Sequence, residues 1–139
     1  MEVILIVSDS ESVLEELRSA LEDQETEIRE LRSGEDVRAA VEEDPPDLVI
    51  TDLQVGSMGG VAICFDLHLE ESGGRIPHIP VLILLDRRAD VFLARRASAE
   101  GWLVKPLDSL KIDRAARAVL DGGVFHDDSY KPLPLASDA

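Results

Sequence analysis

The sequence predicts an α/β protein, a doubly wound parallel sheet of five strands with helices on both faces. Short unbroken apolar runs, such as residues 3–7 and 81–85, are typical of strands buried on both faces. Helical patterns separate these runs, so strands and helices alternate along the chain, as they do in parallel sheets. The chain has 139 residues, which suits one domain with one core.

The N-terminal elements are an apolar strand, an amphipathic helix and a charged strand. After the strand at residues 3–7, apolar residues recur at helical spacing, namely Val13, Leu14, Leu17 and Leu21. Charged residues lie between them, which predicts a helix with one face on the sheet. Residues 25–32 alternate weakly and carry charges, as expected of a strand at the edge of the sheet.

The middle of the chain supplies a helix, a strand and a second helix. The first helix begins at residues 33–35 and ends before the prolines at residues 45–46, because proline cannot continue a helix. The strand follows at residues 48–50. Beyond a loop with three glycines, we expect the second helix at about residues 61–70.

The C-terminal part supplies two strands, two helices and a tail. We expect strands at residues 81–85 and 102–104, with a short and less clearly patterned helix at 89–99 between them. Apolar residues at helical spacing predict the last helix: Leu110, Ile112, Ala115, Ala116, Val119 and Leu120. Residues 122–139 hold glycines, prolines and polar residues, which predicts a C-terminal tail that is partly disordered.

The strand sequences also predict the order of the sheet. The charged second strand belongs at an edge, and the apolar first strand belongs beside the third, which gives the order 2-1-3-4-5. In this order the chain reverses direction between strands 1 and 3. Ligands bind at the carboxyl ends of the strands that flank such a switch point.

Three charged residues follow strands of this sheet. Asp9 comes after the first strand, Asp52 after the third and Lys105 after the fifth. Paired carboxylates repel each other unless a cation relieves them, and Mg²⁺ suits such an oxygen site, with the backbone carbonyl of Gln54 as a third ligand. Lys105 supplies a positive charge for a phosphate oxygen. Together they predict phosphoryl transfer with Asp52 as the nucleophile and an aspartyl phosphate as the product.

The chain resembles the response-regulator receiver family in five segments: residues 6–9, 47–53, 56–60, 79–82 and 103–106. The resemblance implies a flavodoxin-like, CheY-like receiver domain at residues 1–121. It implies that a sensor histidine kinase or a phosphotransfer protein phosphorylates Asp52. Asp9 would then be a metal ligand, and Lys105 would contact the phosphoryl group. Such a domain is a signalling module rather than an enzyme, since the phosphotransfer is self-directed.

Three departures from the family pattern bear on the site. Ser8 stands where the family has a second acidic residue, so we expect weaker Mg²⁺ binding. Leu85 stands at the switch position where the family has Thr or Ser, and Asp86 follows, pointing toward the phosphoryl group or to solvent. Trp102 stands at the aromatic switch position, either as a surface anchor for a partner or packed on the last helix.

The expected role is that of a stand-alone response regulator, because no output domain follows the receiver. It would signal by contact through the fourth helix, fifth strand and fifth helix, to a downstream partner or a second copy of the chain. The alternative is a pseudo-receiver that binds partners whether or not Asp52 is modified. An aspartate phosphatase would need an acid at Gln54, and the acidic, glycine-free loop at residues 8–11 is unsuited to a nucleotide binder.

Composition limits the partners and the location. The chain has 29 Asp and Glu against 14 Lys and Arg, a formal net charge of −15. We therefore expect no binding to nucleic acid or to an anionic membrane. Cys64 is the only cysteine, no secretory signal is evident, and no apolar run approaches the ~20 residues of a membrane span. These features predict a cytoplasmic protein.

Overall fold

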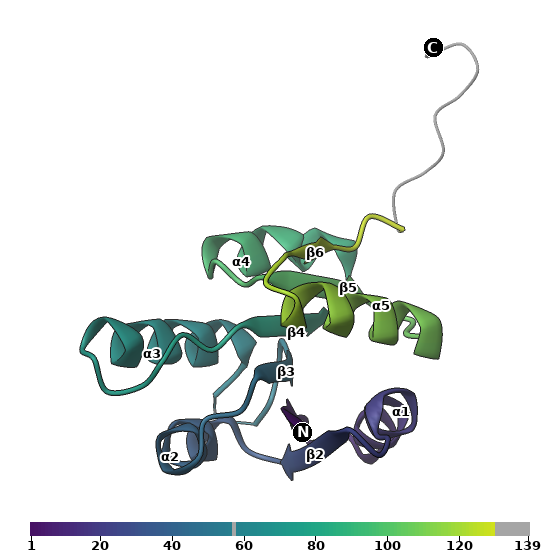
Figure 1. Cartoon of the computed structure of the whole chain (residues 1–139). Helices are drawn as coiled ribbons and strands as arrows, with labels where there is room; N and C mark the ends of the chain where they lie inside the picture. Colours follow the sequence, from purple (N-terminus) through teal and green to yellow (C-terminus); the bar gives the residue numbers. More distant parts are fainter. Residues whose placement is uncertain (57, 130–139) are drawn as a thin grey trace.

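A parallel sheet forms the centre of the computed structural model, which describes residues 1–56 and 58–129. Its six strands lie in the order β2-β1-β3-β4-β5-β6 (Figure 1), and every neighbouring pair is parallel. The strands are β1 (Glu2–Val7), β2 (Thr26–Leu31), β3 (Leu48–Asp52), β4 (Val81–Leu85), β5 (Gly101–Val104) and β6 (Phe125–His126). The predicted order of the first five strands is confirmed.

The sheet has one strand more than predicted. The additional strand, β6, falls within residues 122–139, the segment predicted as a tail. A run of two residues carries no periodic pattern, so hydrophobicity gives no sign of it. It pairs with β5, which would otherwise end the sheet with an open edge. Residues 130–139 lie outside the described part, so the predicted partial disorder remains a prediction there.

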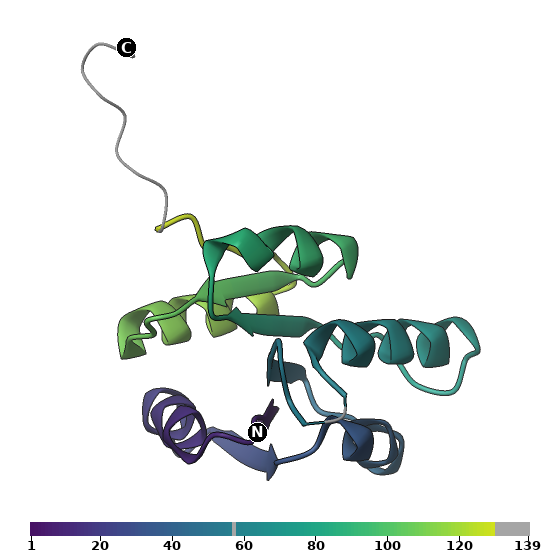
Figure 2. The same ribbon diagram turned by 180° about the vertical axis from the view of Figure 1, so that it is seen from behind.

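Helices cover both faces of the sheet, as predicted. On one face lie α1 (Glu11–Leu21) and α5 (Ser109–Leu120), and on the other lie α2 (Val37–Glu43), α3 (Gly60–Ser72) and α4 (Val91–Arg96). Figures 1 and 2 show these two layers from opposite sides. Within the described residues, no helix is both long and apolar enough to cross a membrane.

The helices that flank the site begin at capping residues. The Ser10 hydroxyl accepts a hydrogen bond from the Val13 N–H at the start of α1, and the Asp108 carboxylate accepts one from the Lys111 N–H at the start of α5. Short 3₁₀ turns, η1 (Gly34–Asp36) and η2 (Arg88–Asp90), precede α2 and α4. The helix predicted at residues 89–99 is therefore shorter than expected.

Two cores lie on opposite faces of the sheet, because successive strand side chains point in opposite directions. In β3, Val49 packs into the core under α2, α3 and α4, whereas Ile50 packs into the core under α1 and α5. Every residue of β3, β4 and β5 is buried. The central strands are therefore held on both sides, and their carboxyl ends are fixed in place.

Charged groups tie the start of β4 to the start of β5. Glu100 accepts the Val81 N–H at 2.8 Å and lies 2.9 Å from His78 Nε2, while the other ring nitrogen of His78 is 2.8 Å from Glu71. The hydrogen bond with Glu71 and the charge of Glu100 raise the pKa of His78 above its ordinary value, although partial burial opposes this. The imidazolium form therefore stabilises this end of the sheet.

Replacing His78 by Gln should make stability less dependent on pH. Because the folded pKa lies above 6.5, the stabilisation is fully present below that pH and is lost as pH rises through the folded pKa. We expect His78→Gln to lower the free energy of unfolding by about 0.5 kcal/mol at acidic pH, since the ring is half-exposed, and by little above pH ~8. Urea unfolding of both proteins at a series of pH values measures this difference in the free energy of unfolding.

The matched control for this prediction is His68→Gln. His68 stacks on the His78 ring but pairs with no carboxylate among the described residues. An equal pH-dependent loss in both variants would contradict the role of the two glutamates.

Candidate functional site

The candidate site lies where β1 and β3 end side by side. Val7 is the last residue of β1 and pairs with Thr51, so Ser8 and Asp52 are brought to the same end of the sheet. The chain leaves these neighbouring strands toward opposite faces, to α1 and to α3. This is the switch point at which open α/β sheets bind ligands.

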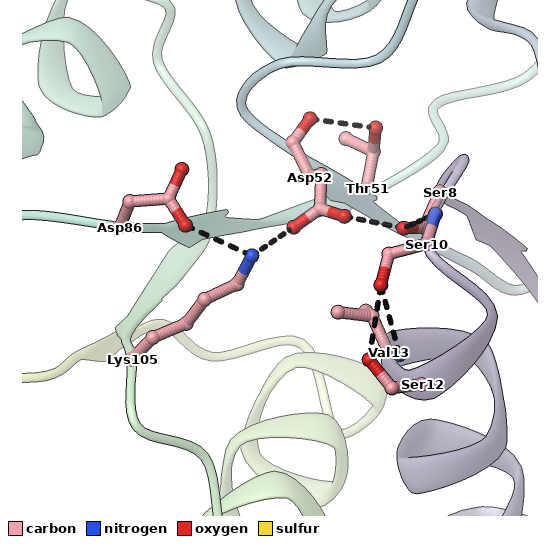
Figure 3. A network of polar contacts seen from close by, with 8 residues as sticks. All are labelled: Ser8, Ser10, Ser12, Val13, Thr51, Asp52, Asp86 and Lys105. Atoms are coloured by element: carbon pink, nitrogen blue, oxygen red, sulfur yellow. Dashed lines mark hydrogen bonds and ion pairs between the residues drawn. The ribbon is translucent and has the colours of Figure 1, made fainter.

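Asp52 is buried, with 5% of the residue exposed, and its two carboxylate oxygens have different partners, a hydrogen bond for Oδ2 and an ion pair for Oδ1. The Ser8 hydroxyl donates to Oδ2 at 2.5 Å, and Lys105 Nζ lies 2.8 Å from Oδ1 (Figure 3). A buried carboxylate needs such partners, because burial without them is costly. The structure therefore brings Asp52 and Lys105 together, as the sequence predicts.

Ser8 takes the place of a carboxylate in this pocket. Its side chain is fully buried, and its oxygen also accepts the Ser10 N–H at 3.0 Å. A hydroxyl donates to Asp52 where a second carboxylate would repel it. The substitution thus lowers the negative charge of the pocket and supplies a neutral hydrogen bond.

Lys105 links two carboxylates at the ends of three strands. Its N–H donates to the Leu85 carbonyl at 2.8 Å, and the following peptide bond to Pro106 is cis. Burial alone would lower the pKa of the Lys105 amine, but hydrogen bonds to Asp52 and Asp86 outweigh this and raise it. The lysine is therefore a fixed positive charge.

The structure shows which way Asp86 points, a question for which the sequence left two alternatives. Its half-exposed side chain reaches back from the end of β4, and Oδ1 lies 3.0 Å from Lys105 Nζ (Figure 3). Asp52 and Asp86 therefore share one amine. Any oxyanion that binds Lys105 must compete with Asp86 for it.

Asp9 and Gln54, the other predicted metal ligands, are not part of this network. Both are exposed, and the Asp9 carboxylate accepts the Gly56 N–H at 3.1 Å, while no described hydrogen bond or ion pair joins it to Asp52. No group of three His, Cys, Asp or Glu in the described chain is placed to hold a metal ion. The predicted ligands all offer oxygen, the donor type that Mg²⁺ prefers, and their joint role as a metal site stays a prediction.

Both switch positions are buried in the same core. Leu85 is fully buried, and Trp102 is 2% exposed in the core under α2, α3 and α4. The Trp102 ring stacks on His126 of β6 at a centroid distance of 4.1 Å, and the Arg95 guanidinium lies 5.2 Å from its centroid. Both predicted placements of Trp102 are therefore wrong: the side chain is covered rather than at the surface, and it packs on the face opposite the last helix, α5.

These features place the chain among doubly wound α/β proteins with a polar site at the switch point of the sheet. The sequence model of the response regulator receiver domain matches residues 4–117, and the chain belongs to this family.

Named relatives are consistent with this family assignment. The chain is 28% identical over 119 residues to Protein PilH of Pseudomonas aeruginosa, with 86% of this chain and 98% of PilH covered. It is 26% identical to the transcriptional regulatory protein AfsQ1 of Streptomyces coelicolor, with 88% of this chain covered but 53% of AfsQ1. The chain thus spans about half the length of AfsQ1.

Solved structures share the fold. A receiver domain of a histidine kinase from Syntrophus aciditrophicus is 25% identical, with a TM-score of 0.77 and coverage of 98% of this chain and 99% of that one. The chemotaxis response regulator CheY4 of Vibrio cholerae is 22% identical, with a TM-score of 0.76 and coverage of 86% and 98%. The expected CheY-like fold is confirmed.

Removing the Lys105 amine should destabilise the fold through Asp52. Lys105→Met leaves a buried carboxylate without its cation, and we expect it to lower the free energy of unfolding by about 2 kcal/mol at neutral pH. The double variant Lys105→Met, Asp52→Asn should recover more than half of the loss, because it removes the uncompensated charge as well. Urea unfolding of the single and double variants measures the coupling.

Asp86→Asn is the matched control, because it removes the exposed partner of the same amine. We expect it to change stability by less than ~0.5 kcal/mol. Equal losses for Lys105→Met with and without Asp52→Asn would show that the amine does not act through Asp52.

Proposed function

We propose that this chain is a response regulator receiver that accepts a phosphoryl group on Asp52 from a sensor histidine kinase or a phosphotransfer protein. It passes the signal on by protein contact. The observation that carries the proposal is the Asp52–Lys105 pair at the switch point of the sheet, with Nζ 2.8 Å from Oδ1. A nucleophilic oxygen and a fixed cation for the incoming phosphoryl oxygens are thus side by side.

The transfer follows from the chemistry of the carboxylate and the amine. An ionised carboxylate attacks phosphorus directly, so an O–P bond forms as the bond from phosphorus to the donor breaks, and the bonding pair leaves with the donor. Ser8 holds Oδ2 and Lys105 lies at Oδ1. To contact the transferred group, the Lys105 amine turns from the carboxylate to the phosphoryl oxygens. The transfer modifies the protein itself, so the chain is a signalling module rather than an enzyme.

A divalent cation belongs to this proposal. Asp9, Asp52 and the carbonyl oxygen of Gln54 would hold Mg²⁺, which supplies positive charge against the phosphoryl oxygens. Ser8 contributes no carboxylate, so the site binds the ion more weakly than one with a second acid. The proposal also places the protein in the cytoplasm, where Cys64 stays a thiol.

A pseudo-receiver is the second candidate function, and the switch positions favour it. Leu85 offers no hydroxyl to a phosphoryl group, and Asp86 already pairs with the lysine that the group would need. As a pseudo-receiver, the chain would bind partners whether or not Asp52 is phosphorylated.

Acetyl phosphate with Mg²⁺ tests the acceptor role. The wild type should gain one phosphoryl group, detected by intact-mass spectrometry or a phosphate-affinity gel, whereas Asp52→Asn should gain none. Asp86→Asn should label at least as fast as the wild type, because Lys105 loses a competing anion. An unlabelled wild type, beside a receiver that is labelled under the same conditions, would leave the pseudo-receiver.

Ser8→Asp should strengthen Mg²⁺ binding by about tenfold or more, because it adds a carboxylate beside Asp52. Calorimetric titration of the folded protein with MgCl₂ measures the affinity directly. The matched control is Ser12→Asp, which adds the same charge on the exposed face of α1. If the two variants bind Mg²⁺ equally, long-range charge rather than a ligand at position 8 is responsible.

A further inference from the structure

A short C-terminal segment covers the open edge of β5. Residues 124–129, called the strap here, lie along β5 between α4 and α5 (Figure 1). Phe125 pairs with Gly101 and His126 with Trp102, and the strap donates main-chain hydrogen bonds to the Glu100 carbonyl at 3.1 Å and the Trp102 carbonyl at 3.3 Å. The strap thus adds a parallel strand to the sheet.

Two side chains of the strap make its specific contacts. The His126 ring lies flat on Trp102, with an interplanar angle of 3°. The Asp127 carboxylate is buried, accepts the Val104 N–H at 2.8 Å and lies 3.0 Å from Lys111 Nζ. Burial would raise the pKa of Asp127, but hydrogen bonds from Ser129 and Val104 outweigh this and lower it. Asp127 is therefore an ionised anchor.

The edge of β5 is shaped for a close-lying strand. A Cβ at Gly101 would lie 2.8 Å from the Phe125 carbonyl oxygen, so only glycine admits the strap at this distance. The strap connects to α5 through Gly122 and Gly123, and Gly122 has a φ of +89°. Such a joint lets the segment change direction at low steric cost.

The strap is short and partly exposed. Its strand is two residues long, Val124 is 60% exposed, and His126 and Asp128 are exposed. A cavity of about 290 Å³ remains between the strap and α5, lined by Leu110, Lys111, Arg114, Phe125, Asp127 and neighbouring residues. In addition, the buried Trp102 Nε1 has no hydrogen-bond partner among the described residues. The strap therefore pairs with β5 but leaves a cavity beside α5 and one buried N–H of Trp102 without a partner.

We propose that the edge of β5 is a docking site for an extended acidic segment of a partner protein, and that the strap occupies this site in the free chain. The inference rests on the proposed function, output by protein contact, and assigns that contact to one surface. The partner adds a parallel strand, as in β-strand addition, and must displace the strap.

The contacts of the strap define what the partner must carry. It needs a ring side chain over Trp102, followed directly by a carboxylate for the Val104 N–H and Lys111. Arg95 and Arg114 add positive charge on either side of the strap, on a chain whose net charge is −15. These two arginines favour an acidic segment at this edge, against the overall negative charge of the chain.

The docking edge adjoins the candidate phosphorylation site. Val104, whose N–H binds Asp127, precedes Lys105, whose amine binds Asp52. A movement of residues 104–105 would therefore change the contacts of both Asp127 and Asp52. In this way phosphorylation of Asp52 can alter the docking edge.

A peptide of residues 122–129 with a fluorescent label tests the proposal, added to the folded full-length chain without any phosphoryl donor. Asp127→Ala loosens the strap and should bind the peptide about tenfold more tightly than the wild type, whose site is occupied. The matched control, Asp128→Ala, loses the same charge from an exposed neighbour and should bind like the wild type. Anisotropy measures binding, and Trp102, the only tryptophan, reports on the site.

A second variant and a second peptide keep the test decisive. His126→Ala should also raise the affinity for the peptide. It replaces Asp127→Ala in the test if circular dichroism shows that Asp127→Ala does not fold. A peptide of the same composition with the His and first Asp exchanged should not bind. Equal binding by all variants would overturn the docking site. A dimeric mass by light scattering that changes in Asp127→Ala but not in Asp128→Ala would assign the edge to a second copy and also overturn the proposal.

Failure here is separate from failure of the proposed function, because labelling of Asp52 is measured independently. Peptide binding should persist in Asp127→Ala combined with Asp52→Asn.

Discussion

The contact between the Asp52 carboxylate and the Lys105 amine is the interaction on which the site depends. It joins the ends of β3 and β5, with the amine 2.8 Å from a carboxylate that is 5% exposed. Without this cation, a buried negative charge would oppose the fold; with it, the carboxylate is paired and oriented. Ser8 completes the pocket by donating a hydrogen bond to the other oxygen of Asp52. Asp86 completes it by pairing with the same amine of Lys105.

The same stretch of chain carries two different surfaces. Trp102 and Val104 meet the strap, while Lys105 meets Asp52. In the receiver family pattern, a hydroxyl at position 85 and an aromatic at 102 connect site and surface; here Leu85 and Trp102 are packed into one core. In this chain the adjacent residues Val104 and Lys105 contact different carboxylates, Asp127 through the main-chain N–H and Asp52 through the side-chain amine.

Much of the fold follows from local pattern. The unbroken apolar runs of β1, β3 and β4 predict buried parallel strands, and the charges of β2 predict its place at the edge. The convergence of Asp52 and Lys105 follows from strand order alone, because the carboxyl ends of parallel strands share one edge. Asp9 follows the same rule in position but not in contacts, since its carboxylate binds a loop N–H instead.

What the sequence determined by itself was the order of the first five strands and the residues at their ends, since hydrophobic periodicity and chain connectivity can be read along the chain. Only the tertiary structure decided the partners of those residues: the Ser8 hydroxyl on Asp52, the turn of Asp86 toward Lys105, and the strap over Trp102. Each of these is a contact between side chains far apart in the chain. Such pairings depend on side-chain direction and on which buried groups still lack partners, and a linear pattern records neither.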